Sequence, residues 1–412
     1  MESDHENSQT RHSQTRSTRL SQFDRDAALQ QTRQRWHWFL VAFAFVASAS
    51  SVFGIETVTV SRDGEQQELS GRILVEAQDG GLLLETPEQI IWTIMPEEIV
   101  SRRSDDASFE LADRKQLTAL TLRDLPPDFN VHNTAHYVIC YNTSKAYAQW
   151  CGALYERLHR AFLNFWKGHG IELTANGPLV AVVFRDKAGY SAYSQPELGE
   201  ATNSIIGYYS LKSNRIVSYD LTGLEQLRAP GDRTGTMAHI SQMLRRPQAE
   251  RTVATIIHEA THQIAFNSGL QRRFADNPLW LSEGLAIYFE SPDLKSRKGW
   301  RRIGAVNQFR LRQMRSYLQK RPAGSLTSLI VDDQRFRDSR LAHHAYAESW
   351  SLCYHLIRTR PQEFKAYLEK IGQKPPLEPT DPEARLAEFK AAFGDDIGLL
   401  DKEFVKAIQQ WR

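Results

Sequence analysis

Cysteine is scarce in this chain of 412 residues, which contains three, at Cys140, Cys151 and Cys353. So few and scattered cysteines exclude a disulfide-built scaffold and a metal site made of thiolates. One bridge between Cys140 and Cys151 and a pair of reduced thiols both stay open. Excess charge is also lacking, since 51 basic residues face 49 acidic ones and the net charge is +2. Without a positive field, a zinc-finger pattern or a glycine-rich phosphate loop, no nucleic-acid partner is predicted.

One long apolar run follows an N-terminal segment that has almost no aliphatic residues. Residues 1–35 are rich in Ser, Gln, Thr and Arg, which predicts a disordered cytoplasmic tail. Residues 36–54 lack Asp, Glu, Lys and Arg and follow Arg33 and Arg35, which is typical of a signal peptide or signal-anchor helix. Residues 47–49 offer a small-residue cleavage site, and a buried core helix is the alternative. The rest of the chain is predicted to be extracytoplasmic: secreted, periplasmic or membrane-anchored through 36–54.

Short apolar runs separated by turns fill residues 55–103. Asp79 and Gly80 lie between two of these runs, where a tight hairpin turn needs a residue that accepts positive φ. The pattern predicts a small antiparallel, barrel-like β module. No His or Cys occurs in it, so an accessory or binding role is favoured over catalysis. Residues 104–130 are charged and interrupted by Pro126 and Pro127, which is typical of a linker.

A second unit is predicted over residues 131–412, and its class is α+β. Strands are expected at 135–141 and 178–184, with a long helix at 145–167 between them. Residues 207–219 have the pattern of a β-hairpin. The remainder of the unit is predicted to be mainly helical.

The segment at residues 249–269 carries an H-E-x-x-H motif on a predicted helix. His258 and His262 are four residues apart, so their imidazoles lie on one helix face and can converge on one metal ion. Glu259 is offset by one residue and can reach a water beside the metal instead. The surrounding apolar residues make the helix buried, and burying these groups is costly without a metal or partner. Two hydrogen-bonded core histidines are the alternative.

A third ligand is predicted on a second helix, at residues 279–290. Asn277 is expected to cap this helix and Pro278 to begin it, which places Glu283 one turn in. Gly284 would allow the helix to pack closely against the first. Glu290, two turns further along, is expected to lie too far from the same ion. A surface carboxylate is the alternative for Glu283.

H-E-x-x-H followed by W-L-x-E-G at residues 280–284 resembles the gluzincin zinc metallopeptidases, in particular the bacterial peptidase MA-like group. Residues 346–356 and 393–404 resemble that group's downstream helices, so the resemblance covers about 135–410. It implies a zincin-like fold, in which a small sheet and an active-site helix precede a helical C-terminal half. It also implies a Zn²⁺ cofactor and a peptide or protein substrate along the edge strand of the sheet. The hairpin at 207–219 is the candidate for that edge.

The expected reaction is hydrolysis of peptide bonds by metal-activated water, with Glu259 as general base. Related enzymes stabilise the oxyanion with a Tyr or His from the helical half, and Tyr346 is the candidate here. Tyr354, His343 and His344 are the alternatives. Candidates for orienting the metal ligands are Asp276, Asn277 and Glu348. Two other functions stay open: a zinc-stabilised binding protein without catalysis, and a membrane-anchored scaffold.

Overall fold

The computed structural model describes residues 54–412, except 176, 225, 226, 228, 230, 232 and 291–302. The predictions for the tail at 1–35 and the apolar segment at 36–54 therefore lie outside the described residues, apart from Gly54. Among the helices that are described, none has both the length and the apolar composition needed to cross a bilayer.

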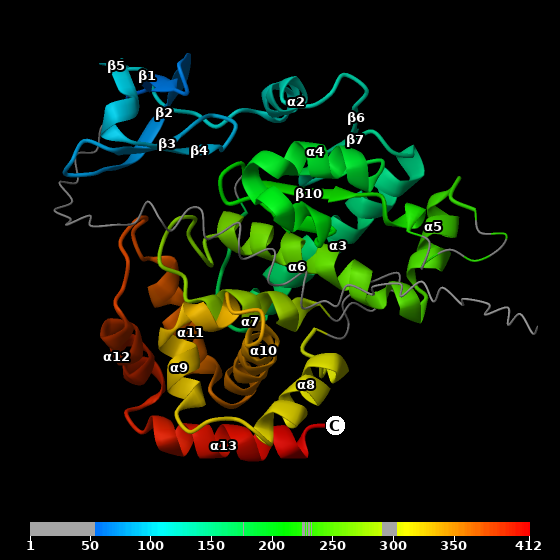
Figure 1. The fold of residues 1–412 in the computed structure, drawn as a ribbon, viewed down its shortest axis with the longest axis vertical. Coiled ribbons are helices and arrows are strands. Elements are labelled where there is room, and N and C mark those ends of the chain that lie inside the picture. The colour runs from blue at the N-terminus through cyan, green and yellow to red at the C-terminus, as the bar shows by residue number, and fades with distance from the viewer. Residues whose placement is uncertain are drawn as a thin grey trace, which may run out of the picture.

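The N-terminal module is a five-stranded antiparallel sheet with strand order β4-β3-β2-β1-β5, drawn in blue and cyan in Figure 1. Its strands are β1 (Glu56–Arg62), β2 (Glu65–Glu76), β3 (Leu82–Glu85), β4 (Ile91–Ile94) and β5 (Ile99–Ser104). Gly80 adopts φ 90° in the turn before β3, as the sequence predicted. The module has its own small core, made of Val58, Val60, Leu69, Leu82, Leu84 and Ile94. The predicted antiparallel β module is confirmed.

The segment predicted as a linker contains a helix, α2 (Arg114–Arg123). Asp113 caps it by accepting a hydrogen bond from the Gln116 N–H, and the Gln116 side chain accepts one from the Asp113 N–H. Arg114 donates to the carbonyl oxygens of Ala135 and Tyr137, which attaches the helix to the central sheet.

The central sheet has the order β6-β7-β8-β10-β9. Its strands are β6 (Asn130–Asn133), β7 (Tyr137–Tyr141), β8 (Leu179–Phe184), β9 (Gly207–Tyr209) and β10 (Arg215–Tyr219). The middle strands β7, β8 and β10 are parallel, and the edge strands β6 and β9 run antiparallel to their neighbours. The predicted hairpin is therefore confirmed, and its first strand is an edge of the sheet.

Helices α3 (Lys145–Gly168) and α4 (Lys187–Leu198) connect the strands, and α5 (Met237–Leu244) precedes the helix that carries the motif. Ser144 caps α3 by accepting a hydrogen bond from the Tyr147 N–H. The motif helix α6 (Glu250–Asn267) contacts β9 and β10 on one side and α7 (Leu279–Phe289) on the other. In Figure 1, α6 lies between the central sheet and the helical half.

The C-terminal half contains α8 (Gln308–Leu318), α9 (Ser325–Val331), α10 (Ala342–Thr359), α11 (Pro361–Gly372), α12 (Pro382–Phe393) and α13 (Ile397–Gln410). At the centre of this half, helix α10 packs along α7. Gly284 makes this contact close, because a Cβ there would lie 2.6 Å from the Ser349 carbonyl oxygen of α10. The prediction that Gly284 faces α6 is therefore wrong. Helix α7 is buried on all sides, so its sequence pattern did not indicate which face meets which neighbour.

The predicted α+β class is confirmed, with the antiparallel module first and the helical half last. The three cysteines are buried and free, so Cys140 and Cys151 do not form the bridge that the sequence left open.

Candidate metal centre

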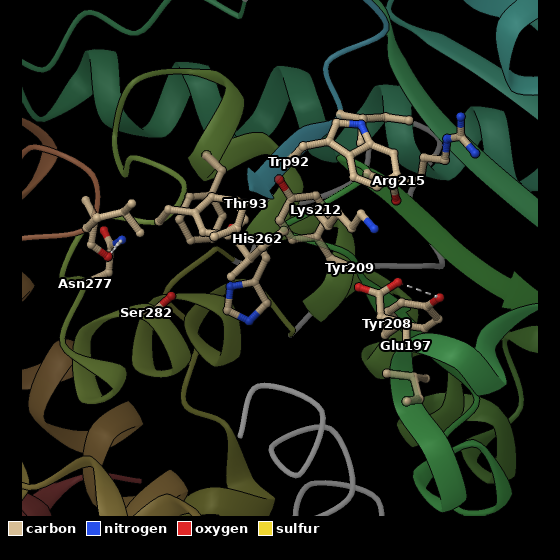
Figure 2. A pocket seen from close by; sticks show the side chains of 18 of the residues that line it. Trp92, Thr93, Glu197, Tyr208, Tyr209, Lys212, Arg215, His262, Asn277 and Ser282 are labelled. Atoms are coloured by element: carbon tan, nitrogen blue, oxygen red, sulfur yellow. Dashed lines mark hydrogen bonds between the residues drawn. The ribbon is translucent and has the colours of Figure 1, made fainter. Parts of the chain in front are cut away.

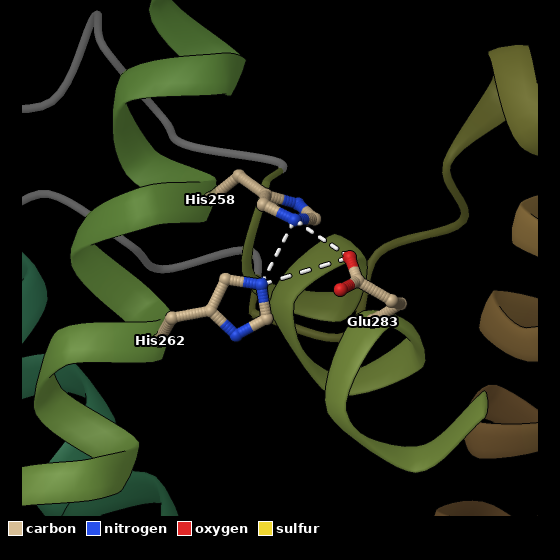
Figure 3. A group of neighbouring side chains, drawn as sticks. All are labelled: His258, His262 and Glu283. Atoms are coloured by element: carbon tan, nitrogen blue, oxygen red, sulfur yellow. Dashed lines mark hydrogen bonds and ion pairs between the residues drawn. The ribbon is translucent and has the colours of Figure 1, made fainter. Parts of the chain in front are cut away.

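Two helices bring the three predicted ligands together in the interior. His258 and His262 occupy successive turns of α6, with their ring centroids 4.7 Å apart and their planes nearly perpendicular. Gly269, with φ 84°, ends α6. The chain then returns to start α7, which carries Glu283 to the same point (Figure 3). All three side chains are buried.

The beginning of α7 differs in detail from the prediction. Pro278 is the N-cap, and its carbonyl oxygen accepts the first helical bonds, from Leu281 and Ser282. The Asn277 side chain does not cap the helix but donates to the carbonyl oxygens of residues 272 and 275. The Leu279 N–H donates instead to Asp333, 54 residues away in the chain.

The facing atoms of the three ligands have the spacing that a small metal ion requires. His258 Nε2 lies 3.0 Å from Glu283 Oε2 and 3.1 Å from His262 Nε2, and His262 Nε2 lies 3.6 Å from Glu283 Oε2. A tetrahedral ion with bonds of about 2.0–2.1 Å places its ligand atoms about 3.3 Å apart. The buried His258–His262–Glu283 group could therefore hold a metal ion.

Glu290 has a role that the sequence did not reveal. It is too far along α7 to join the three ligands, as expected, but its Oε1 lies 2.8 Å from Nδ1 of His258. A carboxylate there holds the proton on Nδ1 and leaves Nε2 to face the ion. Burial lowers the pKa of His258, but the Glu283 and Glu290 carboxylates raise it more, to well above 6.5. Protons and a metal ion therefore compete for this ring.

The residues proposed from sequence to orient the ligands have other partners. Asp276 binds Arg385 and Lys374, and Asn277 bonds to the loop before α7. Glu348 is fully buried in α10, where Arg321 and Arg335 neutralise it. That network ties the C-terminal helices together. The role of Glu290 could have been suspected from its spacing, since positions 283 and 290 lie seven apart and thus on one helix face.

Glu259 points toward the edge of the central sheet. Its Oε2 accepts a 2.8 Å hydrogen bond from the Tyr209 N–H of β9, and the side chain is buried. On the inner side of the hairpin, the Ser210 N–H donates to the Arg215 carbonyl oxygen. Because donors alternate between the two sides of a strand, the Tyr209 N–H faces outward from β10. Glu259 therefore connects the metal-binding helix to the outer edge of β9.

A cavity of about 1600 Å³ opens over these residues and includes His258, Glu259, His262 and Glu283 in its lining. Figure 2 shows that its wall also carries Trp92 and Thr93 of the β module together with Lys212 of the hairpin. The N-terminal module therefore forms part of the cleft, which its sequence did not indicate.

Tyr346, the predicted oxyanion-stabilising residue, lines this cavity. Its ring packs edge-on against Phe336, and the Arg310 guanidinium lies 5.4 Å from its centroid. The alternatives His343, His344 and Tyr354 are described residues that lie outside the cavity lining. His344 stacks on Tyr317, and Tyr354 packs against Tyr288, Trp350 and Trp411.

Buried bonds attach the β module to the hairpin and to α6. Arg273, just after α6, forms a 2.9 Å ion pair with Glu85 of β3 and donates to the Gln89 carbonyl oxygen. The Gln89 side chain accepts from Asn214, which also bonds to Asn267 of α6. Charged and amide groups buried in this way require their partners, so the contact between the module and the sheet is specific.

Comparison with known proteins gives one family match. A family described as a protein of unknown function, DUF1570, matches residues 252–378. The matched segment contains the three candidate metal ligands, Glu259 and Tyr346, and it excludes the β module and the central sheet. No curated protein matches the chain.

Proposed function

We propose that this protein is a zinc-dependent peptidase in which His258, His262 and Glu283 hold the metal and Glu259 is the general base. The observation that carries the proposal is the position of Glu259. It follows a metal ligand directly on α6 and also accepts the Tyr209 N–H of the edge strand at 2.8 Å. A base there is next to both the ion and the strand along which an extended peptide would lie. The sequence resemblance to gluzincins supports the same function.

Zinc suits the donor set, because two imidazoles and one carboxylate with an open fourth position are typical of catalytic zinc sites. When bound, zinc supplies Lewis acidity that lowers the pKa of a water to about 7 and polarises a carbonyl oxygen. Glu259 accepts the proton of the attacking water and transfers it to the leaving amine. Its side chain is 4% exposed, which limits competition from bulk water.

Strand β9 is the proposed docking edge for the substrate. It is the outermost strand of the central sheet beside α6, and an extended peptide can add to such an edge by main-chain hydrogen bonds. The cavity volume of about 1600 Å³ exceeds the range of about 300–1,000 Å³ that is common for small-molecule pockets. The larger space favours a peptide or protein substrate.

Tyr346 is proposed to donate a hydrogen bond to the oxygen that gains charge during attack. Tyr346→Phe retains the ring and its packing on Phe336 but removes the hydroxyl. Loss of one such donor typically lowers kcat about 100- to 1,000-fold. Zinc content should stay at the wild-type level, and an unchanged kcat would remove Tyr346 from the mechanism.

Metal content measured by mass spectrometry and chelator-sensitive cleavage of casein test the proposal together. Wild type should contain about one zinc per chain and cleave casein until chelator is added. Glu283→Ala should lose most of the metal, because only two ligands remain. Glu259→Gln should retain zinc and lose turnover. The matched control is Glu383→Gln, at an exposed position on α12, which should behave as wild type.

Other outcomes would select the alternative functions. Zinc in the wild type without turnover of any peptide would indicate a zinc-stabilised binding protein. Absence of zinc from both wild type and Glu283→Ala would contradict the metal site and favour a scaffold. We also propose an extracytoplasmic location on the basis of residues 36–54, and protection of the folded domain from protease added to spheroplasts would contradict it.

A further inference from the structure

Lys212 lies at the tip of the hairpin that provides the edge strand. The tip is held from inside, since the Ser213 N–H and the Asn214 N–H both donate to Ser210. It is also held by the β module, because the Ile91 N–H donates to the Lys212 carbonyl oxygen at 2.9 Å. The backbone under Lys212 is therefore fixed by two different parts of the fold.

The Lys212 ammonium lies over the indole of Trp92, 4.1 Å from the ring centroid, and both side chains line the cavity. In the described part of the chain, no carboxylate oxygen lies within 4.0 Å of Lys212 Nζ. Burial and the nearby Arg62 charge lower the pKa of Lys212, while Glu197 opposes this effect. A half-buried ammonium in this setting would be stabilised by an anion entering from the cavity.

The neighbouring charges are already engaged. Arg62 forms a two-point ion pair with Glu98, with both distances at 2.7 Å. Arg215 pairs with Asp124 at 2.7 Å. Glu197 accepts a hydrogen bond from the Tyr208 hydroxyl (Figure 2) and another from the Ser210 hydroxyl. Among the described residues, Lys212 is thus a cation of the cavity wall that has no carboxylate partner and is available to a ligand.

We propose that Lys212 and Trp92 form a subsite that binds a carboxylate of the substrate peptide, resting on the peptidase function proposed above. Lys212 follows Tyr209, the residue bonded to Glu259, by three positions. Residues 211–213 form a turn, so the strand rise of about 3.3 Å per residue is an upper limit, and the subsite lies within about three substrate residues of the cleaved bond. Trp92 supplies an apolar face against the carboxylate-bearing residue and gives the β module a role in substrate selection. The carboxylate is that of an Asp or Glu side chain or of the peptide C-terminus.

Matched peptides distinguish these two sources. One series replaces a single residue, at each position around the cleaved bond, by Glu or by Gln. A second series compares free with amidated C-termini. Wild type should favour the carboxylate member of a pair about tenfold in kcat/KM, the lower range for a hydrogen bond between charged groups because Lys212 is partly exposed. Preference in the first series assigns a side chain, and preference in the second assigns the C-terminus.

Variants of Lys212 test whether it causes the preference. Lys212→Met should abolish the preference, Lys212→Glu should reverse it toward a Lys-containing peptide, and Lys212→Arg should retain it. Trp92→Leu should weaken it. Lys402→Glu, on the exposed face of α13, makes the same charge change away from the cavity and should leave the preference intact. Zinc content and the melting temperature identify any variant that has lost its fold.

Binding measured on Glu259→Gln separates this proposal from the peptidase function. Cleavage without a carboxylate preference, or a preference that survives in Lys212→Met, would overturn the subsite and leave the peptidase function standing. Carboxylate binding that depends on Lys212, without cleavage by wild type, would support the subsite and overturn the peptidase function. Absence of both cleavage and carboxylate binding would overturn both.

Discussion

In the proposed zinc site, we expect the hydrogen bond between Glu290 and His258 to control how tightly the metal is held. The two atoms lie 2.8 Å apart, and the side chains are 7% and 9% exposed, so solvent screens the interaction little. Glu290→Gln keeps an oxygen acceptor of similar size but removes the charge. Loss of a group that hydrogen-bonds to a metal-ligating histidine typically lowers metal affinity about 10- to 100-fold. Because the pair is buried, we expect a loss of about 30-fold, which corresponds to about 2 kcal/mol.

Competition with a chromophoric chelator at pH 7 measures this affinity. Glu290→Ala, which also removes the acceptor, should bind zinc more weakly than Glu290→Gln. Glu283→Ala should bind it most weakly, because it removes a ligand. Glu363→Gln, an exposed position on α11, is the matched control. Wild-type affinity in both Glu290 variants would refute the orienting role, and equal losses in Glu290→Ala and Glu283→Ala would show that Glu290 is itself a ligand.

Three further predictions concern stability. In the metal-free protein the pKa of His258 is raised above 6.5. Its contribution to the stability of the fold is therefore complete below about pH 6.5 and is lost as the pH rises through the raised pKa. A melting temperature, measured in chelator, that increases as the pH rises above 6.5 would contradict this prediction. Gly284→Ala should destabilise the fold by about 1–3 kcal/mol in denaturant unfolding, because its added Cβ meets α10. The control is Gly168→Ala, whose added Cβ meets no other atom. Arg273→Ala removes one of the two ion-pair partners of Glu85 and leaves Arg72 as the other, so docking of the β module should weaken by about 1–3 kcal/mol. Faster hydrogen exchange in β3 and β4 would report this loss, and wild-type exchange would refute it.

Local sequence carried most of the information about the three ligands. The spacing of His258 and His262 fixes their angular relation on any α-helix, whatever surrounds that helix. Gly269 and Pro278 mark where one helix ends and the next begins, so the position of Glu283 one turn into α7 was also predictable. The same reasoning predicted the antiparallel module and the hairpin, because alternation and turn residues act over a few positions.

Contacts between distant segments were not predictable in this way. Tyr209 and Glu259 are 50 residues apart, and Trp92 and Lys212 belong to different units of the fold. A single sequence contains no periodicity that relates such pairs. The neighbour of Gly284 was unpredictable for a similar reason, since a helix that is buried on every side gives no pattern from which to choose a neighbour.

The sequence by itself determined which side chains could hold a metal, because helix geometry places residues four apart on one face without help from the rest of the chain. Only the tertiary structure decided what surrounds them. It placed Glu290 behind His258, the β9 edge in front of Glu259, and the β module on the wall of the cleft. These arrangements depend on how buried surfaces pack and on which buried polar groups find partners, and those conditions are set by the whole chain at once.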